Sequence, residues 1–350
     1  MRYNTLGRTG LLVSELCLGT MTFGTEEGFF GAVNGVGLEG ATALLRQAVE
    51  AGINFVDTAN VYTNGQSEEL LGAAISALGL ARSEIVVATK AMGGMGEAPN
   101  QSGTGRKHLL DQIDASLARL GLDHVDLYQI HGWDPVTPME EALRALEDIV
   151  RSGRARYVGV SNWAAWQVTK ALGLAAGHGW AAPVSVQAYY SIAGRGLERE
   201  LAPMLASEGL GLMAWSPLAG GLLSGKYRFG AAGIEGEGRR ASFDFPPVDL
   251  ARAGPVVEAM RSMGKARGVS VAQIAIAWLL HRPVVSSVIV GAKCADQLAD
   301  NIAACAVELT ADDLAQLERL SALAPEFPGW MIERQGGYVA RHLSPPRCPA

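Results

Sequence analysis

The sequence INFVDTANVYTNGQSEELLGAAISALGLARSEIVVATK occupies residues 53–90. It contains two short apolar runs with the length and composition of buried strands, and a longer helical pattern lies between them. Strand–helix–strand order implies parallel strands joined by a right-handed crossover. The same alternation continues along the chain, with short apolar runs at 15–18, 53–56, 85–88, 127–130, 156–160, 184–186, 211–214 and 287–290. Eight runs predict a closed (β/α)8 TIM barrel, although an open sheet fits the same pattern.

Three helical stretches are especially clear. One has four apolar residues on a single face, namely Leu109, Ile113, Leu117 and Leu120. A second spans 139–150 and is acidic at its start, which suits the helix dipole. A third, 271–280, follows Ser270, a residue type that favours helix N-caps. We expect a single domain over 1–350, with the barrel at about 11–305 and a C-terminal helix and tail at 306–350.

Long loops are expected at 25–40, 91–105 and 220–248, all rich in Gly or small residues. Each follows a predicted strand, where an α/β barrel carries its active-site loops. After Thr310 we expect one helix to about residue 323 and then a segment with proline and aromatic residues, all packed outside the barrel.

The composition excludes several classes of protein. Of the 350 residues, 49% are hydrophobic and 18% charged, and the net charge is -6. Without a Lys/Arg run, a nucleic-acid partner is not expected, and the apolar runs are too short to cross a membrane. The N-terminus is polar and unlike a signal peptide. The four cysteines have neither disulfide-framework nor zinc-site spacing; they are Cys17, Cys294, Cys305 and Cys348. We therefore expect a cytoplasmic protein without a metal, with Cys17 in the core.

Reactive side chains stand at the ends of the predicted strands. Asp57 ends the second, with Tyr62 five positions later, Lys90 ends the third, and His131 ends the fourth. The fifth, sixth and seventh end in Ser161 and Asn162, in Gln187, and in Trp215 and Ser216. Because all barrel strands point the same way, these residues are expected on one rim.

The first four residues suit proton delivery to an oxygen. A tyrosine is a weak acid near neutrality, and a nearby ammonium such as Lys90 lowers its pKa. Asp57 can hold Lys90 charged and in place, and His131 can orient a carbonyl. Each residue alone has an ordinary structural explanation, but their conjunction on one rim favours catalysis. The cluster suits protonation as hydride reaches carbon. It does not suit acyl transfer, because GVSNW at 159–163 lacks the second glycine of a nucleophile elbow.

These residues lie in segments that resemble the aldo-keto reductase family over residues 2–323. The matching segments, in family order, are DTANVY at 57–62, ATK at 88–90, LYQIH at 127–131, GVSN at 159–162, QAYYS at 187–191, WSPL at 215–218 and IVG at 289–291 continuing through Asn301. The resemblance implies that Tyr62 is the general acid, that Lys90 and Asp57 tune it, and that His131 positions the carbonyl.

The resemblance also implies a nicotinamide cofactor. Ser161, Asn162 and Gln187 match positions that hold the carboxamide, and Trp215 matches the aromatic residue that stacks on the nicotinamide, where this family usually has Tyr. The full set of implied cofactor contacts is Gly19, Thr20, Met21, Asp57, Ser161, Asn162, Gln187, Trp215, Ser216, Pro217, Leu218, Gly220, Lys226, Gly291, Ala292, Lys293, Gln297 and Asn301. Phe23 and Trp133, with Phe29 and Phe30, are expected to shape the substrate pocket.

The segment SPLAGGLLSGKY at 216–227 resembles a longer bacterial branch, akin to potassium-channel β-subunits, where it wraps the pyrophosphate. Residues 220–226 fit G-x4-G-K, but Tyr227 replaces the Ser or Thr of a P-loop, so nucleotide hydrolysis is rejected. Four cations lie in 220–248, namely Lys226, Arg228, Arg239 and Arg240. We expect this loop to be mobile without cofactor and to close over it.

The implied function is that of an NADP-dependent aldo-keto reductase acting on a small aldehyde or ketone. Lys293 is the single cation in the segment that reads the adenosine phosphate, where relatives usually also carry Arg; NADP(H) is favoured and NAD(H) is possible. One alternative is a cofactor-sensing regulatory subunit. Another is a Schiff-base aldolase that uses Lys90, which Asp57 and Tyr62 argue against. No nucleic acid or membrane partner is expected, and the oligomeric state stays open.

Overall fold

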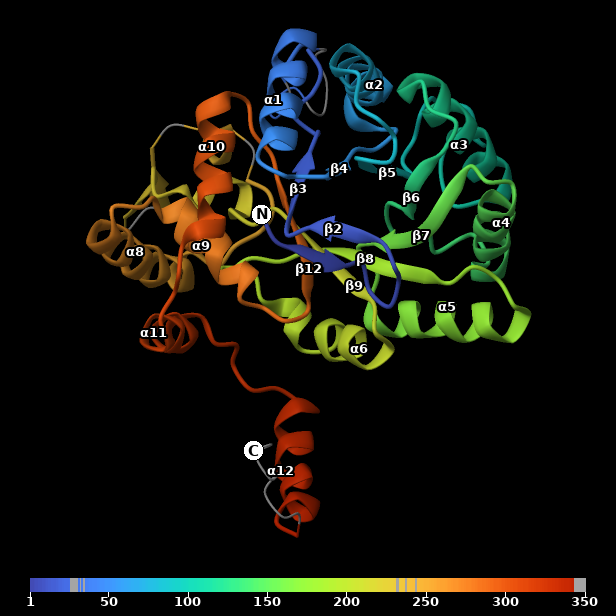
Figure 1. The fold of residues 1–350 in the computed structure, drawn as a ribbon. Coiled ribbons are helices and arrows are strands. Elements are labelled where there is room, and N and C mark those ends of the chain that lie inside the picture. Colours follow the sequence, from blue (N-terminus) through green and yellow to red (C-terminus); the bar gives the residue numbers. More distant parts are fainter. Residues whose placement is uncertain are drawn as a thin grey trace, which may run out of the picture.

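Eight parallel strands close into a barrel in the order β12-β3-β4-β5-β6-β7-β8-β9 (Figure 1). The computed structural model describes residues 1–25, 31, 33, 35–230, 233–236, 238–242 and 244–342. The barrel strands are β3 (Leu16–Gly19), β4 (Phe55–Asp57), β5 (Val86–Ala91), β6 (Val125–Ile130), β7 (Ala155–Ser161), β8 (Pro183–Tyr189), β9 (Gly211–Trp215) and β12 (Val285–Val290). All eight predicted strands are confirmed, and the open-sheet alternative is wrong.

Helices surround the barrel and cover its outer face (Figure 1). They are α1 (Leu38–Glu50), α2 (Gln66–Leu78), α3 (Arg106–Leu120), α4 (Met139–Arg151), α5 (Ala165–His178), α6 (Leu201–Glu208), α8 (Leu250–Arg267), α9 (Val271–Leu280) and α10 (Ala295–Ala303). Short 3-10 turns are η1 (Tyr62–Gly65), η2 (Gly196–Glu198), η3 (Ala219–Ser224) and η4 (Ala304–Ala306). The three clear sequence patterns became α3, α4 and α9. Ser270 accepts a hydrogen bond from the N–H of Gln273, so its predicted role as N-cap is confirmed.

A hairpin outside the predicted pattern closes the amino-terminal end of the barrel. Its strands are β1 (Tyr3–Thr5) and β2 (Leu12–Ser14), which pair antiparallel. The buried side chains of Leu6 and Val13 pack on the inner barrel residue Cys17 and its neighbours. The expected burial of Cys17 is therefore confirmed. Because this end is sealed, chemistry is confined to the other end.

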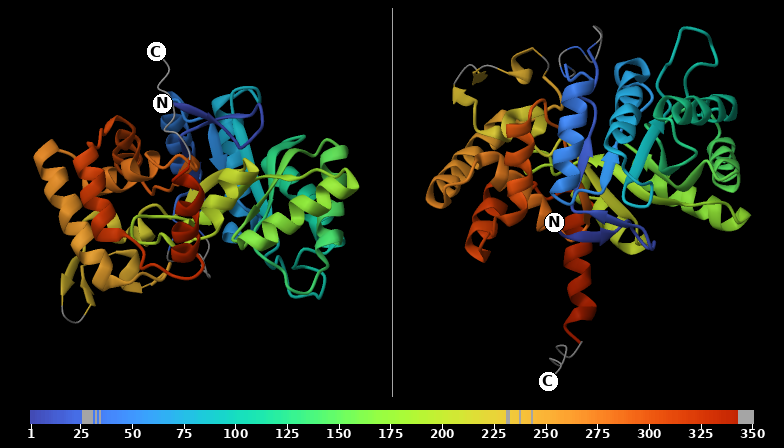
Figure 2. Two further views of the ribbon diagram at one scale, coloured as in Figure 1. Left: turned by 90° about the horizontal axis from the view of Figure 1, so that it is seen from below. Right: turned by 45° about the horizontal axis from the view of Figure 1, so that its top comes forward.

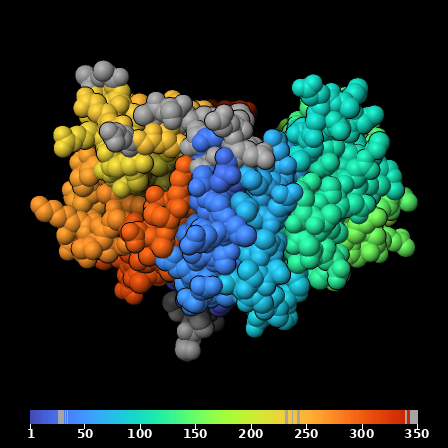
Figure 3. Space-filling model, turned by 90° about the horizontal axis from the view of Figure 1, so that it is seen from above, coloured from blue at the N-terminus to red at the C-terminus, as the bar shows by residue number. Residues whose placement is uncertain are grey.

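The opposite end carries the long loops, and Figure 3 views the molecule from that side. The loop between β5 and α3 matches the prediction for 91–105. Residues 220–248 contain more regular structure than expected, since η3 is followed by the hairpin of β10 (Arg228–Gly230) and β11 (Gly233–Glu235) and by α7 (Arg239–Ser242). Residues 26–30, including Phe29 and Phe30, lie outside the described part of the chain, as does Cys348.

The C-terminal region divides into two parts. Helix α11 (Ala311–Ser321) packs against α8 and is capped by Thr310, whose hydroxyl accepts from the N–H of Asp313. Helix α12 (Gly329–Ala340) extends away from the barrel at the end opposite the long loops (Figure 2). The expectation that the whole tail packs outside the barrel is therefore correct for α11 and wrong for α12. No helix in the described ranges is long and apolar enough to cross a membrane.

Candidate active site

Asp57 and Lys90 form a buried ion pair where β4 and β5 end. Their Oδ2 and Nζ atoms are 2.6 Å apart, and the two residues are 2% and 0% exposed. Lys90 Nζ also donates to the carbonyl of Thr58 at 2.7 Å. Burial by itself lowers the pKa of Lys90, but Asp57 and Tyr62 outweigh burial and raise that pKa above its ordinary value. Lys90 is therefore a fixed ammonium.

Tyr62 begins η1, directly after the loop that leaves β4, and its hydroxyl lies 3.4 Å from Lys90 Nζ. The ammonium lies 5.0 Å from the centre of the tyrosine ring. Burial raises the pKa of Tyr62 more than Lys90 lowers it, so the net direction is upward. The sequence-based expectation of a lowered pKa is wrong, because it did not include desolvation of the phenolate. Tyr62 is consequently a protonated phenol near neutral pH.

His131 follows β6 and faces Tyr62, with the two rings edge to face and their centroids 5.7 Å apart. Burial, followed by the charge of Lys90, lowers the pKa of His131 to about 3. The imidazole is therefore neutral at physiological pH. A neutral imidazole can donate one N–H to a carbonyl oxygen without adding a second positive charge beside Lys90.

The two amide side chains predicted to hold the carboxamide differ in their exposure to solvent. Asn162 is exposed at the rim in a left-handed conformation with φ of 60°. Its Nδ2 donates to the carbonyl of His131 at 3.1 Å and to Ser161 Oγ at 3.0 Å, and its Oδ1 accepts from Trp215 Nε1 at 2.9 Å. Gln187 is buried, and its Nε2 donates to Asp57 Oδ1 at 3.0 Å. Asn162 thus lies at the rim, whereas Gln187 belongs to the network below it.

Trp215 presents an aromatic surface at the end of β9. It packs against Tyr189 at a centroid distance of 5.2 Å, and Phe245 lies nearly parallel to it at 5.8 Å. These two rings cover part of the indole, and its remaining exposed surface is what a planar heterocycle could stack on.

The segment after β9 turns sharply around backbone groups. Ser216 has φ of 53°, and its hydroxyl accepts from the N–H of Gly220 at 3.0 Å, while Pro217 and Leu218 lie between them. Gly220 has φ of 67°, and a Cβ there would lie 2.4 Å from the carbonyl oxygen of Phe245. Only glycine fits this position.

Two cations of this segment differ in accessibility. Lys226 is exposed, whereas Arg240 is 5% exposed. The guanidinium of Arg240 donates to the carbonyls of Ala219 and Pro246 and pairs with Asp244. The expectation that all four cations are available to contact a pyrophosphate is therefore wrong for Arg240, whose hydrogen bonds instead hold the turn together. Lys226 has the accessibility that a phosphate contact requires.

The end of β12 lies beside the first barrel strand. Thr22 Oγ1 donates to the carbonyl of Ala292 at 2.8 Å. Gly19 packs closely on Ile289, where an added Cβ would lie 2.6 Å from Cγ2. Thr20 is buried and bonded to Asp57 O and Ser67, while Met21 is partly exposed.

The predicted adenosine-binding residues begin just after β12. Gly291 and Lys293 are exposed, and Ala292 is buried between them. Gln297 Oε1 accepts from the N–H of Lys293 at 2.9 Å, and Asn301 Nδ2 donates to the carbonyl of Gly291 at 3.4 Å. These two amides thus shape the loop that presents Lys293.

The two predicted substrate residues differ in exposure. Phe23 is 0% exposed and packs in the hydrophobic core, so it does not face solvent in this structure. Trp133 is partly buried and lies edge-on to Trp163 and Trp166, with centroid distances of 5.1 and 5.8 Å. Trp166 is 61% exposed, which leaves an aromatic surface near His131.

Two polar residues of this region were missed from the sequence. Gln129 lies inside the LYQIH segment, but the sequence does not show that its side chain reaches Asp57. Asp134 accepts from the N–H and hydroxyl of Thr104 and from the hydroxyl of Thr137. Burial acts in the opposite direction, but these hydrogen bonds hold the pKa of Asp134 well below its usual range. Asp134 thereby ties the 91–105 loop to the loop that carries Trp133.

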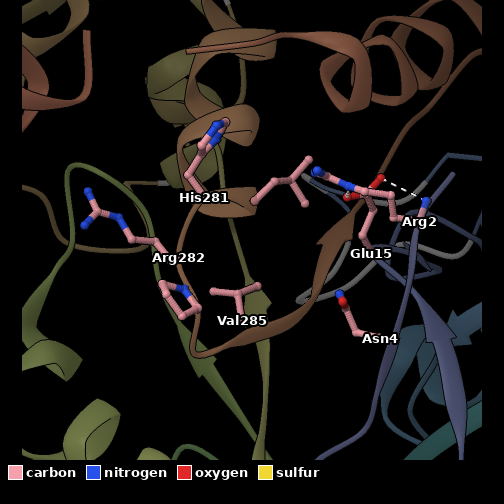
Figure 4. A pocket seen from close by; sticks show the side chains of 8 residues that line it. Arg2, Asn4, Glu15, His281, Arg282 and Val285 are labelled. Atoms are coloured by element: carbon pink, nitrogen blue, oxygen red, sulfur yellow. Dashed lines mark hydrogen bonds and ion pairs between the residues drawn. The ribbon is translucent and has the colours of Figure 1, made fainter. Parts of the chain in front are cut away.

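A separate cavity lies at the other end of the barrel (Figure 4). It is lined by Arg2, Asn4, Glu15, Leu280, His281, Arg282, Pro283 and Val285. Val285 starts β12, whereas the catalytic candidates stand at strand ends. Within the described ranges, no cluster of three or more His, Cys, Asp or Glu side chains could hold a metal ion.

The profile of the aldo/keto reductase family matches residues 15–322. The chain belongs to that family. A probable voltage-gated potassium channel subunit beta of Arabidopsis thaliana is 38% identical over 338 residues, which cover 94% of this chain and 99% of the relative. Versiconal hemiacetal acetate reductase of Aspergillus parasiticus is 33% identical, covering 91% and 96%. The uncharacterized oxidoreductase YrpG of Bacillus subtilis is 36% identical, covering 94% and 97%. This aldo/keto reductase is accordingly an oxidoreductase for NAD(P)H-dependent carbonyl reduction.

Proposed function

We propose that this aldo/keto reductase converts a small aldehyde or ketone to an alcohol, with NADPH as the favoured cofactor and Tyr62 as the proton donor. The observation that carries the proposal is the arrangement of a protonated phenol beside a fixed ammonium and a neutral imidazole. The phenol can release its proton to an oxygen that gains negative charge. Lys90 then stabilises the phenolate that remains, and Asp57 keeps Lys90 in place.

His131 positions the carbonyl in this proposal. Its ring lies edge to face with the ring of Tyr62, which brings the two groups close enough for both to donate to one oxygen in this proposal. Because the imidazole is neutral, it orients and polarises the oxygen, and the proton comes from Tyr62. The raised pKa of Lys90 disfavours a Schiff-base aldolase, since that reaction needs Lys90 as a neutral amine.

The rim residues fit a nicotinamide dinucleotide. When bound, the cofactor supplies the hydride that the carbonyl carbon receives. Trp215 offers the flat surface for its ring, and the Asn162 amide offers polar contacts at the rim. Gly220 lets the turn pack against the carbonyl of Phe245, and exposed Lys226 beyond that turn suits a pyrophosphate. Exposed Lys293 is the cation proposed to favour NADPH, while a single lysine leaves room for NADH.

The names of two relatives favour a second candidate, a cofactor-sensing channel subunit. Besides the Arabidopsis protein, a probable voltage-gated potassium channel subunit beta of rice is 40% identical and is matched over 91% of its length. Asp57, Tyr62, Lys90 and His131 do not separate the candidates. A regulatory subunit could also reduce a carbonyl and thereby respond to the redox state of its cofactor.

The test is a panel of aldehydes, ketones, quinones and keto-sugars, each incubated with NADPH or NADH. Loss of nicotinamide absorbance with stoichiometric alcohol formation supports the reductase. Tight cofactor binding without multiple turnovers on any carbonyl would instead favour the sensor.

A further inference from the structure

Gln129 is a wholly buried amide inside the barrel at the level of the catalytic lysine. It lies on β6, where its Cα pairs with that of Lys90 on β5 and with that of Gly159 on β7. A Cβ at Gly159 would lie 3.3 Å from Gln129 Cγ, so this glycine leaves the space that the glutamine side chain occupies. Gln129 Nε2 reaches across to Asp57 Oδ1 on β4, at 3.1 Å.

The carboxylate of Asp57 is held by three donors. Its Oδ2 accepts from Lys90, and its Oδ1 accepts from Gln129 and from Gln187. Gln187 Nε2 also lies 3.4 Å from Gln129 Oε1. This last contact fixes the orientation of the Gln129 amide, because a flipped amide would set its oxygen against the carboxylate.

We propose that Gln129 is a positioning residue for proton transfer: its hydrogen bond holds the Asp57 carboxylate in place, so that the Lys90 ammonium stays beside the Tyr62 hydroxyl. A buried carboxylate is stable as an anion only while hydrogen bonds and an opposite charge compensate for lost water. If Asp57 takes up a proton, Lys90 loses its counter-charge, and burial then favours the neutral amine. The inference rests on the proposed function, in which Tyr62 needs that positive charge.

The surroundings make Asp57 the group to test by pH. Near pH 7, Lys90 on β5 is the charged partner that faces it. Burial raises the pKa of the Cys17 thiol on β3 well above its usual value, so that group is neutral. Tyr62 and His131 are neutral as well. A difference in acid-side turnover between the wild type and a Gln129 variant would therefore point to the Asp57–Lys90 pair.

The main test variant is Gln129→Met, which keeps the length of the side chain and removes the donor. We expect kcat at pH 7 to fall tenfold or more, since hydrogen bonds to charged groups are among the strong ones. The KM for carbonyl and the Kd for NADPH should stay within about twofold, because Gln129 lies below the rim. From pH 7 to pH 5, the kcat of the variant should fall more than that of the wild type.

The matched control is Tyr128→Phe on the same strand. It removes a buried hydroxyl that donates to the carbonyl of Leu109 on α3, outside the barrel. This variant should lose stability and keep the wild-type pH profile. If Gln129→Met also keeps the wild-type kcat and pH profile, the positioning role is wrong. Should Gln129→Met fail to fold, Gln129→Asn, which is one methylene shorter, replaces it with the same expected outcomes.

A measurement without turnover separates this inference from the proposed function. Carbon-13 NMR of labelled aspartate side chains, with Asp57→Asn for assignment, follows protonation of Asp57 directly. In Gln129→Met, Asp57 should take up its proton at a higher pH than in the wild type. If wild type reduces no carbonyl, the proposed function fails, yet this titration still tests Gln129. An unchanged titration would overturn the role of Gln129 even in an active reductase.

Discussion

The indole Nε1 of Trp215 donates a 2.9 Å hydrogen bond to Oδ1 of Asn162, and so links the ends of β9 and β7 across the rim. Asn162 adopts φ of 60°, a conformation that is uncommon for residues other than glycine. The bond from Trp215 therefore fixes the amide of a residue whose backbone is already constrained. The donor is the indole N–H, which the tyrosine that usually occupies the corresponding position in the family does not have.

Trp215→Phe should weaken NADPH binding by about two- to twelvefold, because it keeps an aromatic ring and loses one hydrogen bond of ordinary strength. Isothermal titration calorimetry measures this Kd, because replacing Trp215 also changes the intrinsic fluorescence. The control is Tyr189→Phe, which keeps the ring that packs on Trp215 and loses only a hydroxyl contact with Ser191. Equal affinities for all three proteins would show that the bond to Asn162 does not support cofactor binding.

Tyr62→Phe should abolish carbonyl reduction and leave NADPH affinity nearly intact. In the proposed function the hydroxyl provides the proton, whereas the ring, which lies 5.0 Å from Lys90 Nζ, remains in the variant. Steady-state turnover and a fluorescence titration with NADPH check the two halves of this prediction. Tyr3→Phe is the control, since its hydroxyl donates to the carbonyl of Gly52 on the surface, away from the tetrad. Parallel loss of binding and turnover in Tyr62→Phe would mean that Tyr62 is misassigned.

His131 should make the protein less stable as the pH falls. Its pKa is lowered to about 3 in the folded state, while an unfolded histidine titrates near 6.5. Between these values the unfolded chain binds the extra proton, so the contribution to stability is present above pH 6.5 and is lost as pH falls toward 3. By pH 5 the loss attributable to His131 is about 2 kcal/mol.

Urea unfolding at pH 7 and at pH 5 measures this contribution. The free energy of unfolding of His131→Gln should fall less between the two pH values than that of the wild type. His178→Gln, which changes a histidine near the end of α5, is the control and should follow the wild type. If His131→Gln and the wild type lose equal stability, His131 is not held neutral by its surroundings.

Lys293→Ala should raise the Kd for NADPH more than the Kd for NADH, because only NADPH carries the extra phosphate. Loss of an ion contact to phosphate corresponds to about ten- to hundredfold in affinity. The control is Lys265→Ala in the last turn of α8. Equal effects of Lys293→Ala on both cofactors would remove Lys293 from phosphate recognition.

NADPH should protect residues 220–240 from amide hydrogen exchange, as expected for a loop that closes over the cofactor. Arg240 already ties the two ends of this segment together, because it donates to the carbonyl of Ala219. The largest change should therefore fall between these ends, within 220–230, which includes the exposed Lys226. Residues 231, 232 and 237 lie outside the described part of the chain. Unchanged protection across 220–230 would contradict closure.

The sequence by itself determined the barrel and the end of the barrel at which the candidate site residues lie. Apolar runs of strand length report burial locally, and alternation with helices forces the strands to be parallel. Once the strands are parallel, residues at their ends meet on one rim, which brings together Asp57, Lys90 and His131. The hairpin of β1 and β2 was missed because its strands are only three residues long. In addition, the apolar end of the barrel on which it packs exists only once the barrel has closed.

Tertiary structure alone decided the environment of each side chain. Phe23 is buried, Arg240 donates to two carbonyls, and Gln129 reaches Asp57 two strands away. The pKa of Tyr62 rises because burial outweighs the neighbouring ammonium. Desolvation and hydrogen bonding depend on atoms contributed by strands and loops far apart in sequence, so no local pattern can report them.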